Sequence, residues 1–577
     1  MLPSRPFASF AMALLLAAPA GAEWANGCGD GRFDAVVEGF EETAAWSLCC
    51  TDRDLPQVTL SNVEGCSGRA LRVGWDLRGG DWIVLIRNLP AGIDLRPYSH
   101  LRLAFRGTNL LARQNLQLKL VDGAGRVFWT VAESVTDLPV WRPLYIDLRE
   151  LTCFGDDCSP ATALDLSDIR QLQIAVARCL RDSGPCEVTE EEGGVELDEL
   201  VAVDLRPGGA HRLVQTARER VRIDPDLRAA TAGAILGHQH NNGLVPAWFP
   251  EPAPNYNTFA EAVALLVFLA EAERTGDPRY REAASRLSGA LVDLQLKAPA
   301  ANAGAWMTAY TLRDNAIASL DATCTGDESR VQDVDRCAWV GNTAWATLAL
   351  ARAVNAGIAP DLPRARAGVA AGAAWMAAQV GRISAYPALV TEGLEGNVST
   401  YFGLAAAGRT ADAAALGEAI RAHGWDPVER RLKIGARPQD FATAMDMAGS
   451  WGAQFLRHIG RPAEALASQG FAATVLRTRT FDGSLAGYGD IAGPWTLTVE
   501  FGAQAAAAGI LGANEVMSGI YPLMRTDGSF PGGADEWYGG TVAPWTTTMT
   551  GVAPTAWVYF AQNGDPLEPR ARRRSVR

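Results

Sequence analysis

The chain has 577 residues and a formal net charge of −13, and 48% of its residues are hydrophobic against 20% charged. This is the composition of a globular protein that is too long for a single domain. Its only lysines are Lys119, Lys297 and Lys433, and it has no basic stripe that would hold a phosphate backbone, which makes nucleic acid a poor partner.

The N-terminus has the three parts of a secretory signal peptide. Arg5 gives a positive start, Phe10–Ala18 is apolar, and the small residues from Ala20 to Ala22 resemble a cleavage site. Residues 1–22 are therefore predicted to be removed, and no later run is apolar enough to predict a membrane span. We expect an exported protein, periplasmic or extracellular, that acts as a monomer.

Ten cysteines fit an oxidising compartment. Several fall in short local pairs, namely Cys153/Cys158, Cys179/Cys186 and Cys324/Cys337, and four more lie near the start, at Cys28, Cys49, Cys50 and Cys66. Zinc is the alternative, but the chain lacks a tight C-x-x-C pair and has only six histidines. Disulfides are predicted, with no metal and no cofactor.

Residues 23–206 are typical of an antiparallel β-sandwich. Short alternating runs such as "RALRVGWDL" and "HLRLAFRG" are separated by turn residues, and the loop Asp122–Gly125 suits a hairpin. With its later runs "WRPLYIDLREL" and "VELDELVAVDL", this region resembles the jelly-roll carbohydrate-binding modules that accompany polysaccharide-degrading enzymes. An aromatic face matches the C–H face of a sugar ring, so Trp75, Trp82 and Trp129 are candidates for stacking on sugars. For each of them taken singly, a place in the core is the favoured interpretation.

Residues 207–566 change to helices rich in small residues. Helices of one kind start near Thr258, Gly341, Glu395, Met447, Val499 and Pro554, and after a first gap of about 83 residues they recur every 52 to 55 residues. More polar helices lie between them, at Asp277–Leu296, Leu362–Val380 and Arg461–Thr478, and another is expected at Ala210–Arg222. Six inner and six outer helices predict an (α/α)6 barrel. Together with the sandwich, this barrel would make a multidomain protein. Residues 567–577 are predicted to be a basic, disordered tail.

The loops before the inner helices should surround a central cavity. They carry aromatic residues that are predicted to contact a sugar, at Trp248, Tyr256, Trp306, Trp339, Trp495, Trp537 and Trp545. For each tryptophan the alternative is a core position. Their recurrence in one class of loop favours sugar-binding subsites.

Two short motifs strengthen this interpretation. Glu395, Asn397 and Tyr401 open one inner helix, and Glu500 and Gln504 open another. The helical region resembles the (α/α)6 glycoside hydrolases, in particular exported bacterial proteins with these two helix starts. The resemblance implies that Asn397, Tyr401 and Gln504 bind substrate. Related proteins often carry an aspartate where this chain has Ser399, which removes one possible acid.

Hydrolysis of a glycosidic bond needs two carboxyl groups, one to protonate the leaving oxygen and one to activate water or attack the sugar. Glu395 and Glu500 are the leading candidates, followed by Asp446 and Asp314, while the structural alternative is that each glutamate caps its helix. The predicted activity is an endo-acting, inverting glycosidase on a β-glucan or a bacterial exopolysaccharide.

Two other functions stay open from the sequence. A polysaccharide lyase would need a tyrosine or histidine base and a group that neutralises a uronate, and His240, Asn241, Tyr256 and Arg313 could supply them. A non-catalytic polysaccharide-binding or export factor is the other alternative, which Ser399 keeps open.

Overall fold

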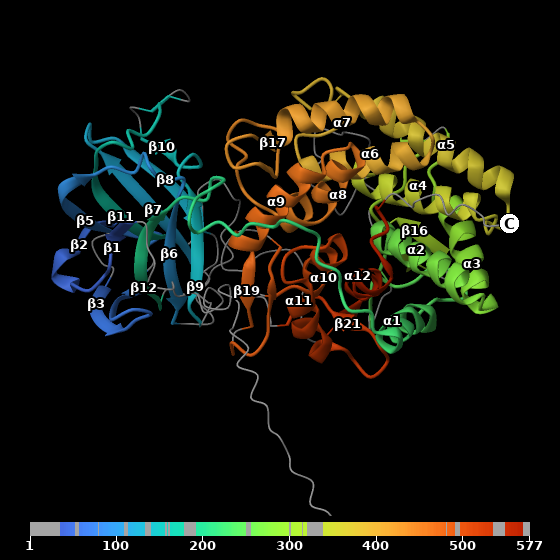
Figure 1. Ribbon diagram of the computed structural model, residues 1–577, viewed down its shortest axis with the longest axis horizontal. Helices are drawn as coiled ribbons and strands as arrows, with labels where there is room; N and C mark the ends of the chain where they lie inside the picture. Colours follow the sequence, from blue (N-terminus) through green and yellow to red (C-terminus); the bar gives the residue numbers. More distant parts are fainter. Residues whose placement is uncertain are drawn as a thin grey trace, which may run out of the picture.

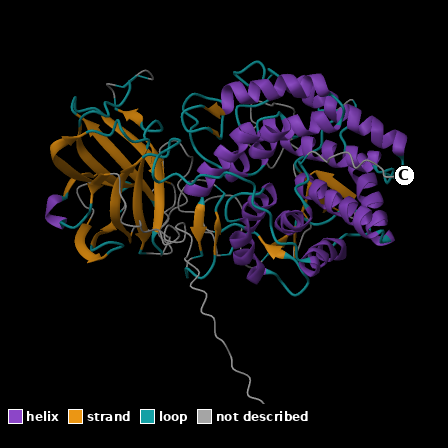
Figure 2. Cartoon of the chain, viewed as in Figure 1, coloured by secondary structure: helices purple, strands orange, loops and turns teal. Residues whose placement is uncertain are grey.

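The computed structural model describes residues 35–51, 57–78, 80–108, 114–132, 140–155, 158–159, 162–177, 192–249, 255–298, 302–313, 316–319, 338–382, 384–480, 482–490, 497–534 and 549–568. A β-sandwich is followed by a helical region, and the two lie side by side (Figures 1 and 2). The predicted signal peptide lies outside the described residues. Among the helices described, none combines the length and the apolar character needed to cross a membrane.

The sandwich consists of two antiparallel six-stranded sheets. The first has the order β3-β4-β12-β6-β9, with β1 paired to β12, and the second has the order β10-β8-β7-β11-β5-β2. The strands of the first sheet are β1 (Ala35–Glu38), β3 (Gln57–Glu64), β4 (Arg69–Asp76), β6 (His100–Gly107), β9 (Arg142–Asp147) and β12 (Glu192–Val203). Those of the second are β2 (Ser47–Thr51), β5 (Trp82–Ile93), β7 (Asn115–Asp122), β8 (Val127–Ala132), β10 (Thr152–Phe154) and β11 (Ile169–Ala177). This confirms the predicted sandwich.

The alternation of side chains divides β12 between two cores. Ala202 packs inside the sandwich, whereas its neighbours Val201 and Val203 pack in the core of the helical region. Because successive side chains point to opposite faces of a strand, the outer face of the first sheet lies against the helices. Tyr145 on β9 joins the same helical core, so the two regions share a packed interface.

Disulfides link two pairs of described cysteines. Cys153 is bonded to Cys158, as predicted, and the adjacent Cys49 and Cys50 are bonded to each other. Among the described residues no cysteine is free. The other two predicted local pairs lie outside the described residues.

In the part of the chain that the structure describes, the helical region has twelve α-helices. Those of the inner set are α2 (Thr258–Thr275), α4 (Val340–Asn355), α6 (Leu394–Ala406), α8 (Trp451–His458), α10 (Val499–Ala508) and α12 (Val552–Asn563). Those of the outer set are α1 (Pro225–Gly237), α3 (Pro278–Leu294), α5 (Leu362–Gln379), α7 (Thr410–Gly424), α9 (Pro462–Val475) and α11 (Ala513–Ile520). A π-helical turn, Met445–Gly449, leads into α8.

The inner helices close a ring. Each contacts the next in chain order, and α12 contacts α2 (Figure 1). Small residues allow the close approach, because a Cβ atom at Gly403 on α6 would lie 3.0 Å from the Cα of Ala344 on α4. α4 is buried on nearly every side, as expected for a helix that packs all round.

A relay of backbone hydrogen bonds runs around one end of this ring. The first residue of an inner helical segment donates its N–H to a carbonyl in the loop before the next segment, and five such bonds are present: Thr258 to Thr308, Leu394 to Ile434, Met445 to Asp490, Val499 to Gly532 and Val552 to Ala247. Helix N-termini leave unpaired N–H groups, and these bonds satisfy one at each start. The relay fixes the register of the six helix starts around the axis.

The predicted helix at 210–222 is wrong. This segment is irregular and bonds to other elements, since Leu213 N–H donates to Thr474 Oγ1 and the side chain of Gln215 donates to the Gly509 carbonyl. The first outer helix is α1, which begins where Asp224 caps the chain and Pro225 occupies the first turn. The packed part of the chain also extends further than predicted, because Leu567 is buried.

Candidate active site

The second residue of each inner segment occupies an equivalent place in the ring. Glu395 on α6, Asp446 on the π-helical turn and Glu500 on α10 hold this place on three consecutive segments. The other half of the ring has Ala553 on α12, Phe259 on α2 and Gly341 on α4. One half of the ring mouth is therefore acidic and the other is apolar.

The three carboxyl groups interact electrostatically. Burial, followed by the charges of Asp446 and Glu500, raises the pKa of Glu395 to about 8. Burial raises the pKa of Asp446 to about 7, against an opposing hydrogen bond from Met447 N–H, and Asp490 adds to the increase. Burial raises the pKa of Glu500 to about 8, and Asp490 again adds to it. The structure thus brings together three of the four predicted acids, with Asp490 beside them.

Among the described residues, no positive charge balances this cluster. Within the described ranges, no arginine or lysine forms an ion pair with Glu395, Asp446 or Glu500, and burial and other carboxylates are what raise their pKa values. A buried carboxyl without a cation retains its proton at neutral pH. Such a group can act as a general acid.

Gln504 orients Glu500. Its Nε2 donates to Glu500 Oε1 at 3.1 Å, and its Oε1 accepts from Ser450 Oγ at 3.2 Å. Ser450 directly follows the π-helical turn that carries Asp446, so one buried amide links two of the acids. Gln504 is fully buried, so the described structure shows it supporting Glu500, and its predicted contact with substrate stays a prediction.

Asn397 has a similar supporting position. Its Oδ1 accepts from Val390 N–H at 2.9 Å, and its Nδ2 donates to the carbonyls of Thr391 and Gly393 at 2.7 Å each. These bonds fold the loop that leads into Glu395. Since Asn397 is fully buried, the structure places it behind the site rather than in contact with a substrate.

Two of the predicted aromatic residues lie at the ring mouth. Trp248 lies against Gly551, where a Cβ atom would be 2.8 Å from the indole, and α12 begins at the next residue. Trp339 lies against Gly341, where a Cβ atom would be 2.6 Å from the indole, and a Cβ atom at Gly396 would be 3.7 Å away. Both rings are partly buried, and Trp339 is next to the start of the helix that carries Glu395.

Three other predicted sugar contacts are buried in the protein. Trp306 is fully buried and donates its Nε1–H to the Leu291 carbonyl at 2.7 Å. Tyr256 is fully buried with its hydroxyl 2.7 Å from His240 Nδ1, and Tyr401 is 6% exposed with its hydroxyl 2.7 Å from His458 Nδ1. Burial and these hydrogen bonds account for the positions of the three side chains, and their predicted contacts with a sugar stay predictions.

Four predicted residues fall outside the part of the chain that the structure describes. They are Asp314, Trp495, Trp537 and Trp545.

The ring contains a cluster of tryptophans, called the aromatic floor below, that was not predicted from the sequence. Trp345, Trp451 and Trp557 come from three inner helices, and their ring centroids lie 5.1 to 6.1 Å apart. Phe259 lies against two of them, with centroids 5.2 Å from Trp345 and 5.8 Å from Trp451. Aligning the helix starts would have placed Phe259 opposite the acids, but helical periodicity alone gave it no special role.

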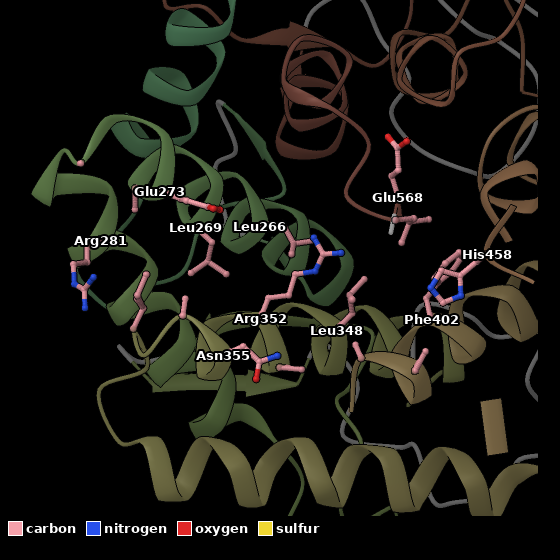
Figure 3. A pocket seen from close by; sticks show the side chains of 18 of the residues that line it. Leu266, Leu269, Glu273, Arg281, Leu348, Arg352, Asn355, Phe402, His458 and Glu568 are labelled. Carbon is pink, nitrogen blue, oxygen red and sulfur yellow. The ribbon is translucent and has the colours of Figure 1, made fainter. Parts of the chain in front are cut away.

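A cavity lies at the other end of the ring. It has a volume of about 760 Å³ and is lined by residues near the C-terminal ends of α2, α4, α6 and α8, among them Leu269, Arg352, Phe402 and His458 (Figure 3). Ala406, which also lines it, follows Glu395 by eleven residues, which is roughly 16 Å along a helix. The cavity is therefore separate from the carboxyl cluster.

Comparison with known proteins identifies no family. No protein-family model and no curated protein matches the sequence. Among solved structures, a family 11 carbohydrate-binding module from Clostridium thermocellum, in complex with a β-1,3-1,4-mixed-linked tetrasaccharide, aligns with 13% identity and a TM-score of 0.23 over 30% of this chain and 95% of its own.

Two further structures align with more of the chain. A β-1,2-glucanase from Parabacteroides distasonis aligns with 10% identity and a TM-score of 0.37 over 93% of this chain and 96% of its own. A D-mannose isomerase aligns with 13% identity and a TM-score of 0.42 over 58% of this chain and 96% of its own. Likeness at this level assigns no activity, so the function has to be inferred from the residues of the site.

Proposed function

We propose that this protein is an exported glycoside hydrolase that cleaves a polysaccharide at the mouth of an (α/α)6 barrel. The observation that carries the proposal is the meeting of the partly buried Glu395 with the buried Asp446 and Glu500, in a cluster that no arginine or lysine of the described residues neutralises. Their pKa values are raised by burial and by carboxyl groups, including Asp490. Perturbed carboxyl groups at a ring mouth lined by aromatic residues match the needs of glycosidic hydrolysis.

The contacts of the two glutamates support different roles for them. Glu395 is held protonated by burial and by its acidic neighbours, so it donates the proton to the leaving oxygen. Glu500 accepts a hydrogen bond from Gln504, which favours its charged form, although burial and Asp490 outweigh this bond and raise its pKa to about 8. Glu395 has no such bond, so we assign the activation of water to Glu500 once it has lost its proton. Asp446 lies on the segment between them and keeps the proton on Glu395.

The ring order favours an inverting reaction. Glu395 and Glu500 lie on segments that flank the one carrying Asp446. Inverting enzymes need about 6.5–9.5 Å between their two carboxyl groups to accommodate a water molecule, which fits two groups with a third segment between them.

The second sheet of the sandwich suits glycan binding. Its outer face carries linked amides, since Gln173 donates to Gln171 at 2.8 Å and Gln171 donates to Asn88 at 2.7 Å. Trp129 lies on the same face, 5.4 Å from Phe154 in an edge-to-face contact. Trp75, by contrast, is only 4% exposed and fills the core. We therefore assign glycan binding to the face of Trp129 and not to Trp75.

The test is a screen of the purified mature protein on neutral and uronic polysaccharides. New reducing ends and the ultraviolet absorbance of an unsaturated uronate are measured together, with Glu395→Gln and Glu500→Gln in parallel. Reducing ends without absorbance, lost in both variants, support the proposal. Absorbance would instead indicate a lyase, and binding without either signal would indicate a non-catalytic factor.

A further inference from the structure

The apolar half of the ring mouth is built from three aromatic side chains. Trp248 lies beside the start of α12, Phe259 is the second residue of α2, and Trp339 precedes α4. These three helices are consecutive in the ring, and the three segments that carry the acids complete it. A ligand at the mouth thus has carboxyl groups on one side and aromatic rings on the other.

Phe259 packs against aromatic side chains inside the ring. It contacts both Trp345 and Trp451, which come from α4 and α8, and α8 is three positions away from α2 in the six-helix ring. Trp345, Trp451 and Trp557 beneath it are at most 4% exposed, whereas Phe259 is only partly buried. The exposed part of Phe259 therefore covers the floor at the level of the acids.

The acidic half sets the charge that a substrate must have. A substrate carboxylate close to Glu395, Asp446 and Glu500 would lose its water and would find no arginine or lysine of the described residues that pairs with these groups. A neutral sugar avoids this cost. It also offers a face of C–H groups that can pack on an aromatic ring.

We propose that Phe259 is the platform for the sugar unit at the reaction centre, flanked by Trp248 and Trp339, and that this arrangement selects a neutral sugar over a uronate. The inference rests on the proposed hydrolase function and specifies its substrate class. Phe259 determines specificity by holding the ring of the sugar on the side opposite the acids.

The experiment compares Phe259→Leu and Phe259→Tyr in the full-length mature protein. Leucine keeps an apolar contact with Trp345 and Trp451 but removes the flat face, and tyrosine retains it. Phe268→Leu is the matched control, because Phe268 is fully buried further along the same helix. Unfolding temperatures of all the variants separate a loss of the platform from a loss of stability.

The substrates are a neutral β-glucan and the same β-glucan after oxidation of its primary hydroxyls to carboxylates. We expect kcat/KM on the neutral glucan to fall about tenfold in Phe259→Leu and to recover to within about threefold in Phe259→Tyr. The oxidised glucan should be cleaved at least about tenfold more slowly than the neutral one by the wild type. Unchanged kcat/KM in Phe259→Leu, or equal cleavage of both glucans, would overturn the inference.

A second measurement separates this inference from the proposed function. Binding of a neutral glucan oligosaccharide is followed by calorimetry in Glu395→Gln and in the double variant with Phe259→Leu. If the wild type releases no reducing ends, the hydrolase proposal fails, yet about tenfold weaker binding in the double variant still supports the platform. Equal binding in both would contradict it.

Discussion

The protein contains two buried groups of carboxylates with opposite electrostatic surroundings. At the interface between the sandwich and the helices, arginines pair with the acids. Arg149 contacts Asp147 at 2.6 Å, Asp426 at 2.9 Å and Glu429 at 2.9 Å, and Arg431 contacts Glu429 at 2.8 Å. At the ring mouth no such pairing is present among the described residues.

The pKa values of the interface carboxylates and of the ring-mouth carboxyl groups are shifted in opposite directions. Burial alone would raise the pKa of Asp147, but His100, Arg149 and Arg431 outweigh it and hold the pKa below its usual range. Burial would also raise the pKa of Asp426, but Arg149 outweighs it and holds this pKa below its usual range. Glu150 at the edge of this interface is an exception, because burial and Asp147 raise its pKa to about 7.

The contrast separates a structural cluster from a functional one. His100, Asp147 and Glu429 have ligand atoms within 4.8 Å of one another, a spacing that could hold a metal ion. Two arginines already neutralise these carboxylates, so the group is explained as an ion-pair network that joins the domains. Among the described residues, the ring-mouth acids have no such arginine. Burying carboxyl groups without a cation destabilises the fold, so a catalytic role would explain why they are retained.

The largest expected effect is on activity. Glu395→Gln and Glu500→Gln should each lower kcat by about 10²–10⁴-fold, because each removes one proton-transfer group. Initial rates of reducing-end release measure this. Glu464→Gln, on the outer helix α9, is the control and should keep the wild-type rate. Wild-type rates in either ring-mouth variant would contradict the assignment.

The next effect is on stability at the interface. Arg431→Met should destabilise the protein by about 3–5 kcal/mol, because Glu429 would be left buried with less compensation. Chemical denaturation measures the change. Arg409→Met is the matched control, since its ion pair with Asp412 is on the surface and should be worth less than about 1 kcal/mol. Equal losses in the two variants would mean that the interface arginine has no special role.

A smaller effect concerns the pH profile. The proton on Glu395 is needed for catalysis, so kcat should fall above about pH 8 in the wild type. Asp446→Asn removes a negative neighbour, which lowers the pKa of Glu395 and moves this alkaline limb to lower pH. Asp412→Asn, on the outer helix α7, should leave the limb in place. A shift to higher pH in Asp446→Asn would be incompatible with the proposed coupling.

The last effect is a gain in stability. The folded-state pKa of Glu395 is raised from 4.5 to about 8, so the folded protein binds this proton more tightly and loses stability as the pH rises between these values. Glu395→Gln should therefore be more stable than the wild type by up to about 4 kcal/mol at pH 8, and the gain should vanish near pH 4. Denaturation at both pH values tests this, and a loss of stability at pH 8 would contradict it.

The periodic parts of the fold could be predicted from the sequence. Alternating strands before residue 206 and small-residue helix starts near Thr258, Glu395 and Val499 correspond to observed elements, because burial imposes these periods. The segment at 210–222 could not be predicted. The hydrogen bonds of Leu213 and Gln215 to Thr474 and Gly509 span more than 250 positions in the chain, and no local pattern indicates such partners.

The candidate site was predictable in part for the same reason. The helical repeat has an acid at the same position in three segments, at Glu395, Asp446 and Glu500. Their proximity could therefore be predicted from the sequence. Trp306 and Tyr256 share the loops of the site but point into the core, and composition alone does not distinguish the two orientations. The interface network was missed because Asp147 and Glu429 are far apart in the sequence and belong to different domains.

The most direct test of the account is an infrared titration of the ring-mouth carboxyl groups. Difference spectra between the wild type and Glu395→Gln isolate the C=O stretch of one protonated carboxyl as the pH is raised. Because the pKa of Glu395 is raised to about 8, we expect this band to be present at pH 7 and to disappear near pH 8. In the Asp446→Asn background it should disappear at a lower pH. A Glu395 that is already ionised at pH 5 would contradict the claim that an uncompensated acid cluster is maintained for catalysis.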